Sequence, residues 1–256
     1  MKSLNTMNDH APKSEWFQRL FDKGNEFFED HKLGPVQVPF FVRFLRDAGI
    51  ATGNELLPFA YIVIDIGWDS DTAMGLILVN LVNHNPTFDW YVKNFDVGKI
   101  YERKTIEAML AHYDVKPKAA KQICGACRRI VKTPIGTKLI FGYVEGASYV
   151  RTTCSISDPR VMLYALYKFA EKCNDYKQFT LNTLLSDSIE RDGISPTRIF
   201  GLGREAMILL LIGLSDRYPY FISATFTNDL DKISLMDDKS SEDVLKLFER
   251  GNSNVQ

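Results

Sequence analysis

A stretch of positive charge is the part of this sequence best suited to chemistry. Residues 115–144 contain lysine and arginine but no aspartate or glutamate, although the formal net charge of the whole chain is only -1. The basic side chains of the stretch are Lys116, Lys118, Lys121, Arg128, Arg129, Lys132 and Lys138. Positive charge at this density is typical of a surface that binds phosphate groups.

The spacing of these side chains indicates a helix with two different faces. If residues 117–132 are helical, one stripe of that helix carries Lys118, Lys121, Gly125, Arg128 and Lys132. The opposite stripe is apolar and carries Ala120, Ile123, Cys127, Ile130 and Val131. We therefore expect one face to be buried and the other to meet phosphates.

On this interpretation the basic stripe, with Lys116 and Arg129 beside it, contacts phosphates or the edges of bases. Gly125 would let the backbone approach the nucleic acid closely. Lys138 and Arg151 fall in two later runs that favour β-structure, where we expect them to contact flanking phosphates. The alternative is that these charges only solvate an exposed helix face.

A C-x-x-C motif lies inside the same stretch, at Cys124 and Cys127. This spacing is used by zinc sites and by redox-active thiols. Cys154 and Cys173 are distant single cysteines, and the pair would sit in the middle of a helix rather than at an N-terminus that lowers a thiol pKa. We therefore predict neither a metal nor a redox role.

Other motifs do not support catalysis. Residues 201–206 match G-x-G-x-x-A, but the segment before them is predicted to be helical, whereas a dinucleotide site needs a strand there. A break between two helices explains the glycines better. Asp65, Asp69 and Asp71 are typical of turns and caps, although a nuclease whose residues assemble only in space stays open. We predict no catalytic residue and no cofactor.

Composition places the chain among ordinary globular proteins, with 45% hydrophobic and 25% charged residues. The longest apolar run, residues 206–214, is much shorter than the roughly 20 residues that span a bilayer. The N-terminus has no apolar segment of the signal-peptide type. We expect a cytoplasmic protein without membrane contact, whose four cysteines are free thiols.

Charge is distributed unevenly along the chain. Residues 115–157 carry 8 lysines and arginines against one acidic residue, whereas residues 1–114 carry 11 against 16 and residues 158–256 carry 12 against 15. The middle segment is therefore strongly basic between two acidic ones. This pattern favours one localised contact surface over general polyanion binding.

Periodicity and turn signals predict a mainly α protein with small β-hairpins. A mobile tail over residues 1–13 is followed by a helical N-terminal region over residues 14–100, whose dense aromatic side chains we assign to packing. In residues 101–157, two helices over 104–113 and 117–132 precede a hairpin with strands over 138–144 and 149–155. We call residues 101–157 the basic unit.

A similar order of elements follows in residues 158–256. Helices are predicted over 159–173, 181–186, 195–200 and 203–218, then a hairpin with strands over 221–226 and 232–236, and a C-terminal helix from Ser240 or Ser241. The helix over residues 203–218 is apolar through its middle, so we expect it to be buried on several sides or to form an interface with a protein partner or a second copy of the chain.

The helix, turn, helix and hairpin order from Lys104 to Met236 resembles the tandem winged helix-turn-helix proteins of bacteria. That class includes transcription regulators, plasmid replication initiators and accessory subunits of DNA-modification or phage-defence systems. The resemblance lies in the architecture, covers about half the chain and implies two winged-helix-like units, one basic and one acidic.

We therefore expect a non-catalytic protein that binds duplex DNA, as a regulator or as an accessory subunit of a DNA-processing assembly. One alternative is an adaptor whose basic face docks an acidic protein. A second is a metal-dependent nucleic-acid enzyme. The sequence leaves all three open.

Overall fold

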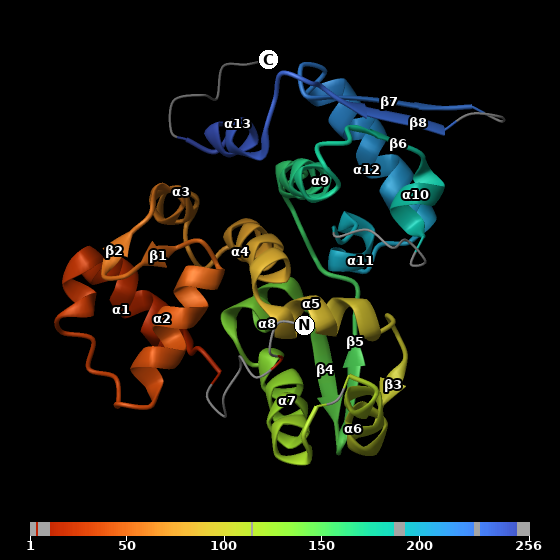
Figure 1. Ribbon diagram of the computed structural model, residues 1–256. Helices are drawn as coiled ribbons and strands as arrows, with labels where there is room; N and C mark the ends of the chain where they lie inside the picture. Colours follow the sequence, from red (N-terminus) through yellow and green to blue (C-terminus); the bar gives the residue numbers. More distant parts are fainter. Residues whose placement is uncertain (1–3, 5–10, 114, 187–192, 228–230, 250–256) are drawn as a thin grey trace. The chain divides into compact units, whose positions relative to one another are not determined.

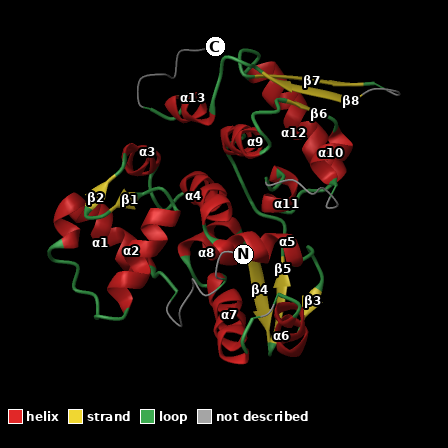
Figure 2. Ribbon diagram, viewed as in Figure 1, coloured by secondary structure: helices red, strands yellow, loops and turns green. Residues whose placement is uncertain are grey.

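The computed structural model describes residues 4, 11–113, 115–186, 193–227 and 231–249. Helices predominate and the strands form small antiparallel sheets, as predicted (Figures 1 and 2). The chain divides into two units, residues 1–155 (unit 1) and 156–256 (unit 2). Among the described residues, no helix has the length and apolarity needed to cross a membrane.

Unit 1 begins with helices that surround an aromatic core. Its first elements are α1 (Ser14–Lys23), the 3-10 helix η1 (Gly24–Phe28), α2 (Gln37–Asp47), β1 (Ala51–Thr52), β2 (Glu55–Leu56), α3 (Pro58–Ile66), α4 (Asp71–His84) and α5 (Pro86–Asn94). Phe17 and Phe41 are fully buried and pack edge to face, with ring centroids 5.2 Å apart. The predicted packing role of these aromatic side chains is confirmed.

The predicted tail over residues 1–13 is described only in part. Residues 1–3 and 5–10 lie outside the described chain, but Leu4 is buried, and its carbonyl oxygen accepts a hydrogen bond from the Thr87 hydroxyl at 2.8 Å. Leu4 is therefore attached to the start of α5.

The predicted basic unit, here called the basic segment of unit 1, follows. It consists of β3 (Ile100–Tyr101), α6 (Arg103–Ala111), α7 (Pro117–Ile130), α8 (Pro134–Leu139), β4 (Gly142–Glu145) and β5 (Ser148–Arg151). β5 is the central strand of a three-stranded sheet of order β3-β5-β4. Tyr101 and Tyr149 are paired across this sheet and buried beneath it. The boundary predicted between residues 100 and 101 thus falls inside β3.

Helix α8 departs from the predicted order. The sequence after α7 suggested a turn followed by a strand from residue 138, but Pro134 instead starts a new helix, where its missing N–H costs nothing. The Thr133 hydroxyl accepts a hydrogen bond from the Gly136 N–H at 3.2 Å and caps this helix. The first strand of the hairpin therefore begins only at Gly142.

Gly136 lets α8 turn back tightly against the end of α7. A Cβ atom at this position would lie 2.1 Å from the Ile130 carbonyl oxygen and 2.5 Å from the Val131 Cα. Because both are backbone atoms, they cannot move aside without displacing α7. A glycine is therefore required at this junction.

Unit 2 consists of α9 (Arg160–Lys172), β6 (Gln178–Phe179), α10 (Leu181–Leu185), α11 (Pro196–Phe200), α12 (Arg204–Arg217), β7 (Ile222–Phe226), β8 (Asp231–Leu235) and α13 (Ser241–Lys246). Its sheet has the order β6-β8-β7, which matches the strand order of unit 1. The helices differ, because the 14-residue helix directly precedes the hairpin in unit 2, whereas α8 intervenes in unit 1.

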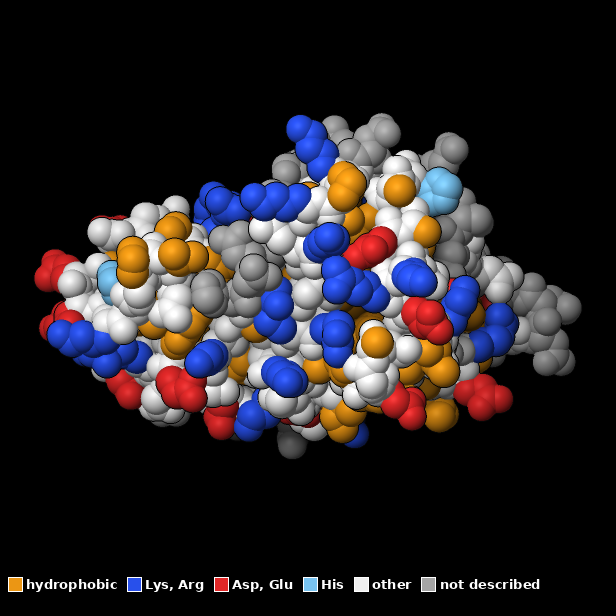
Figure 3. Space-filling model, turned by 90° about the horizontal axis from the view of Figure 1, so that it is seen from below, with side chains coloured by type: hydrophobic (Ala, Val, Ile, Leu, Met, Phe, Trp, Pro, Cys, Tyr) orange, Lys and Arg blue, Asp and Glu red, His pale blue; other side chains and the backbone are white. Residues whose placement is uncertain are grey.

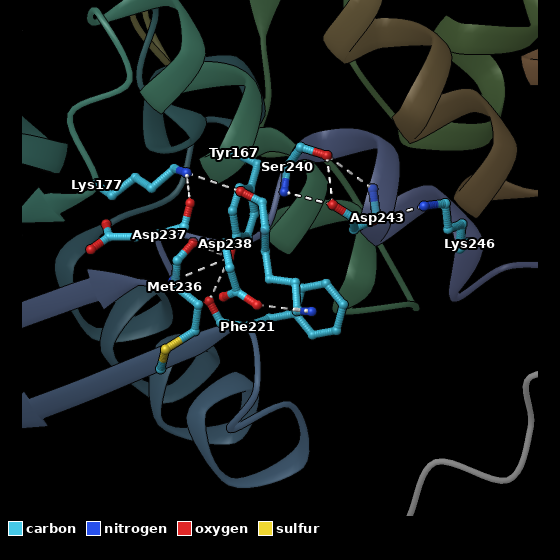
Figure 4. A network of polar contacts seen from close by, with 10 residues as sticks. Tyr167, Lys177, Phe221, Met236, Asp237, Asp238, Ser240, Asp243 and Lys246 are labelled. Atoms are coloured by element: carbon cyan, nitrogen blue, oxygen red, sulfur yellow. Dashed lines mark hydrogen bonds and ion pairs between the residues drawn. The ribbon is translucent and has the colours of Figure 1, made fainter.

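Buried polar contacts join α9 to the end of the hairpin in unit 2 (Figure 4). The Tyr167 hydroxyl donates to the Phe221 carbonyl oxygen at 2.7 Å and accepts from the Met236 N–H at 3.2 Å. The buried Lys177 amine donates to the Asp237 and Lys239 carbonyl oxygens at 2.8 and 3.0 Å. These bonds fix the turn that leads from β8 into α13.

A capping box starts α13. The Ser240 hydroxyl accepts from the Asp243 N–H, while the Asp243 carboxylate accepts from the Ser240 N–H at 3.0 Å. The Lys246 amine also donates to this carboxylate at 2.8 Å. The hydrogen bonds from Lys246 and Ser240 lower the pKa of Asp243 to about 2.

We predict that Gly136→Ala lowers the free energy of unfolding by about 1–3 kcal/mol or more, because the new methyl group overlaps backbone atoms. The midpoint of urea unfolding, followed by circular dichroism, measures this effect. Gly213→Ala is the matched control: its Cβ would meet nothing within 4 Å inside α12, so alanine should stabilise by about 0.5–1 kcal/mol. Equal midpoints for the two variants would contradict this account of the junction.

The capping box predicts a stability that depends on pH. Since the Asp243 pKa is lower in the fold than its ordinary value, the contribution of its carboxylate is complete above about pH 4 and is lost as pH falls towards 2. Asp243→Asn should therefore cost about 0.5–2 kcal/mol at pH 7 and almost nothing near pH 2. Unfolding curves measured from pH 7 to pH 2 test whether the stabilities of the variant and the unmodified chain converge. Glu29→Gln, at an exposed position, is the control. A difference in the free energy of unfolding between the two proteins that is as large at pH 2 as at pH 7 would contradict this role of Asp243.

Candidate nucleic-acid interface

Helix α7 has the two faces that its sequence predicts. Ala120, Ile123, Cys127 and Ile130 are buried, with 5% or less of each exposed. This apolar side packs against α6, where the Cys124 thiol reaches the Arg103 carbonyl oxygen at 4.0 Å. The opposite side of α7 is consequently held outward by the packing of its apolar side.

The lysines of the predicted stripe lie on that outward side. Lys118 and Lys121 in the first turns and Lys132 just beyond the helix are all exposed. Lys116, which is the N-cap residue and not part of the stripe, is exposed as well. Figure 3 views the molecule from the end of unit 1 that carries α6 and α7, and positive side chains are densest across the middle of this face. Only isolated acidic side chains lie among them.

The two arginines of α7 are less accessible than the lysines. Arg128 Nη2 donates to the Gly146 carbonyl oxygen at 2.9 Å, which joins α7 to the loop between β4 and β5. The Arg129 guanidinium lies over Gly125, where an added Cβ would be 2.9 Å from its Nη2. The predicted close approach of a ligand to the Gly125 backbone would therefore require Arg129 to move.

Lys138 lies on α8 rather than on a strand. Its amine forms an ion pair with the Asp69 carboxylate at 3.4 Å, and both side chains are about half exposed. An exposed ion pair of this kind stabilises by at most about 1 kcal/mol, so a phosphate could displace Asp69.

The prediction that Arg151 contacts phosphate is wrong. Only 1% of Arg151 is exposed, and Nη1 donates to the Val92 and Phe95 carbonyl oxygens, at 2.9 Å each. These carbonyl groups end helix α5, where positive charge is favourable. Alternation along β5 places Arg151 on the same inward side as Tyr149, and sequence alone did not reveal which side was inward.

Apart from Arg151, the β4–β5 hairpin is not basic. Its loop and strands carry Glu145, which is exposed, and Tyr143, which is 49% exposed. With Arg151 buried and Lys138 on α8, the positive surface is confined to α7 and its flanks. The hairpin therefore lacks the charge expected of a phosphate-binding wing.

Cys124 and Cys127 lie on the buried side of α7. Burial raises the pKa of the Cys124 thiol to about 11 and raises that of Cys127 further. Both thiols are consequently protonated at neutral pH, which makes them poor nucleophiles. Their positions are those of small core side chains.

The other motifs also lie where structural roles explain them. Gly201 ends α11 with a left-handed φ of 68°, and α12 starts at Arg204, so G-x-G-x-x-A is a break between helices. Asp71 accepts a hydrogen bond from the Thr72 N–H at 2.7 Å in the first turn of α4. In the described part of the chain, no group of three or more histidine, cysteine or acidic residues is arranged to hold a metal ion.

Lys104 was missed by the sequence reasoning. It is exposed in the first turn of α6, the helix that packs on α7, but it precedes the acid-free stretch and has Glu102 and Glu107 nearby in sequence. The predicted helix-turn-helix order was the signal that could have added α6 to the candidate surface.

Comparison with known proteins found no match: no protein-family model, no curated protein and no solved structure matches the chain.

We predict that Arg151→Met lowers the free energy of unfolding by about 2–3 kcal/mol or more, because two buried carbonyl groups at the end of α5 lose their donor. Thermal or urea unfolding measures the loss. Arg128→Met, which removes an exposed hydrogen bond to Gly146, is the control and should cost less than about 1 kcal/mol. A fully stable Arg151→Met variant would show that the buried guanidinium is dispensable.

Proposed function

We propose that unit 1 binds duplex DNA through the outward face of α7 without catalysing a reaction. The observation that carries this proposal is the exposed lysine surface of Lys116, Lys118, Lys121 and Lys132, in a stretch free of acidic residues. An ordinary solvated helix mixes charges of both signs, whereas this face attracts only anions.

The arrangement of elements supports the same proposal. Helices α6 and α7 are two successive packed helices, strand β3 precedes them, and the β4–β5 hairpin that completes the three-stranded sheet follows them. This is the order of a winged helix-turn-helix unit, in which the second helix enters the major groove. Helix α8 is an addition to that pattern.

The side chains available on α7 favour contacts with phosphate over base recognition. Lysine is a flexible point charge that binds phosphate without the planar geometry of arginine, and both arginines of α7 are engaged within the protein. Gln122, half-exposed on α7, has the amide chemistry to read adenine. We therefore propose binding with strong salt dependence and limited sequence preference.

In biological terms, such a protein would serve as a regulator or as an accessory subunit of a bacterial DNA-processing, modification or phage-defence assembly. A module that binds DNA mainly through phosphates positions other components on the duplex. The acidic net charge of residues 158–256 supports a division of labour in which DNA contact belongs to unit 1.

We predict that Lys118→Glu combined with Lys121→Glu abolishes duplex binding at physiological salt. If each lysine neutralises one phosphate, single removals to neutral glutamine should reduce the salt slope of log K by about 0.9 each. Fluorescence anisotropy with a labelled duplex over a salt series measures both effects.

The matched control is Lys172→Glu with Lys232→Glu, which makes the same charge change at exposed positions of unit 2. This variant should keep most of the affinity, and circular dichroism should show both variants folded. Equal losses in the two variants would point to a non-specific effect of net charge. The adaptor alternative predicts a different result: the chain would not bind DNA measurably, but it would bind a protein partner that polyglutamate displaces.

A further inference from the structure

Helix α12 is buried along one narrow stripe only. Met207, Leu211 and Leu214 are fully buried, but 73% of Leu209 and 41% of Ile212 are exposed. The expectation from its apolar sequence, that this helix is buried on several sides, is therefore wrong. An apolar face of α12 remains in contact with solvent.

Acidic residues bracket this apolar face. At 100° per residue, Glu205, Leu209, Ile212 and Asp216 fall within about 60° of one another along the exposed side. Glu205 and Asp216 are exposed, one near each end of the helix. Along the exposed stripe, two apolar side chains therefore lie between two acidic ones.

Helix α12 contacts neighbouring elements of unit 2 near both of its ends. The Ser215 hydroxyl accepts a hydrogen bond from the Ala224 N–H of β7 at 3.1 Å. At the other end, the Arg204 guanidinium binds the Asp231 carboxylate at 3.3 Å and Asn182 Oδ1 at 3.1 Å. The exposed side chains therefore project from a helix that is packed through Met207, Leu211 and Leu214 and joined to its neighbours near both ends.

The charges argue against nucleic acid and against a second copy of the chain as the occupant. Glu205 and Asp216 would repel phosphates. In an antiparallel pairing of two α12 helices about their midpoint, Glu205 of one copy would face Asp216 of the other. Like charges placed opposite each other are unfavourable.

We propose that the exposed face of α12 docks an amphipathic helix of a different protein. The chemistry that fits is an apolar pair, one residue against each of Leu209 and Ile212, flanked by lysine or arginine one turn further out on each side. Opposite charges at Glu205 and Asp216 would fix the register, and the apolar pair would supply most of the affinity. This proposal depends on unit 2 alone and is independent of DNA binding by unit 1.

The probe is a synthetic helical peptide of about 18 residues with lysine, leucine, isoleucine and lysine at positions i, i+4, i+7 and i+11. The comparison peptide replaces both lysines with glutamate. Binding of each labelled peptide to the full chain is measured by fluorescence anisotropy. We expect the lysine peptide to bind at least about tenfold more tightly than the glutamate peptide, with affinity falling as salt is raised.

Leu209→Gln with Ile212→Gln should weaken binding of the lysine peptide by at least about tenfold, while the helix persists, because glutamine is a good helix former. Glu205→Lys with Asp216→Lys should reverse the preference between the two peptides. Ile100→Gln is the control, since Ile100 is 61% exposed in unit 1 and should not affect binding.

Three results would overturn the proposal. The first is no saturable binding of the lysine peptide up to about 1 mM. The second is equal binding of both peptides, or binding that survives the double glutamine substitution. The third is self-association of the unmodified chain, seen by analytical ultracentrifugation and lost in the glutamine variant, which would assign this face to a second copy.

Discussion

The close contact between Gly136 and the end of α7 sets the geometry of the basic segment. Because a side chain at residue 136 would overlap the Ile130 carbonyl oxygen, only glycine lets α8 turn back at this point. The Thr133 hydroxyl completes the junction by donating to the same carbonyl oxygen at 2.6 Å while capping α8. The direction of α7, and hence of its lysine face, depends on this turn and on the packing of α7 against α6.

A related junction occurs in unit 2 with different atoms. Ser195 precedes Pro196, and its hydroxyl donates to the Leu184 carbonyl oxygen at 2.5 Å, which joins the start of α11 to the end of α10. Gly201 ends α11 in the left-handed conformation that glycine adopts without strain. Each unit therefore uses a hydroxyl residue before proline to start a short helix and a glycine to make a sharp turn possible.

Much of this fold was predictable, because amphipathic spacing identifies α7 and turn signals identify both hairpins. What the sequence did not reveal was contact between distant segments. β3 and β6 have two residues each, too few for any periodicity, and exist because they pair with β5 and β8. For the same reason Arg151 seemed available as a surface charge: its burial depends on α5, whose last residue precedes it by more than fifty positions.

Comparison of the two sheets shows which side-chain positions folding constrains and which it does not. Their inward rows correspond in register, Tyr101, Tyr149 and Val144 in unit 1 and Phe179, Ile233 and Ala224 in unit 2, and both rows are apolar. The rows on the other side differ, with Ile100, Val150 and Tyr143 in unit 1 and Gln178, Ser234 and Ser223 in unit 2. Val150 is buried, whereas Ile100 is 61% and Tyr143 is 49% exposed. The long helices differ in the same way, since both bury an apolar stripe while α7 presents lysines and α12 presents leucine and isoleucine between acids. Core packing constrains every buried position, Val150 included, whereas the exposed positions of α7 and α12 are free to match what each unit binds.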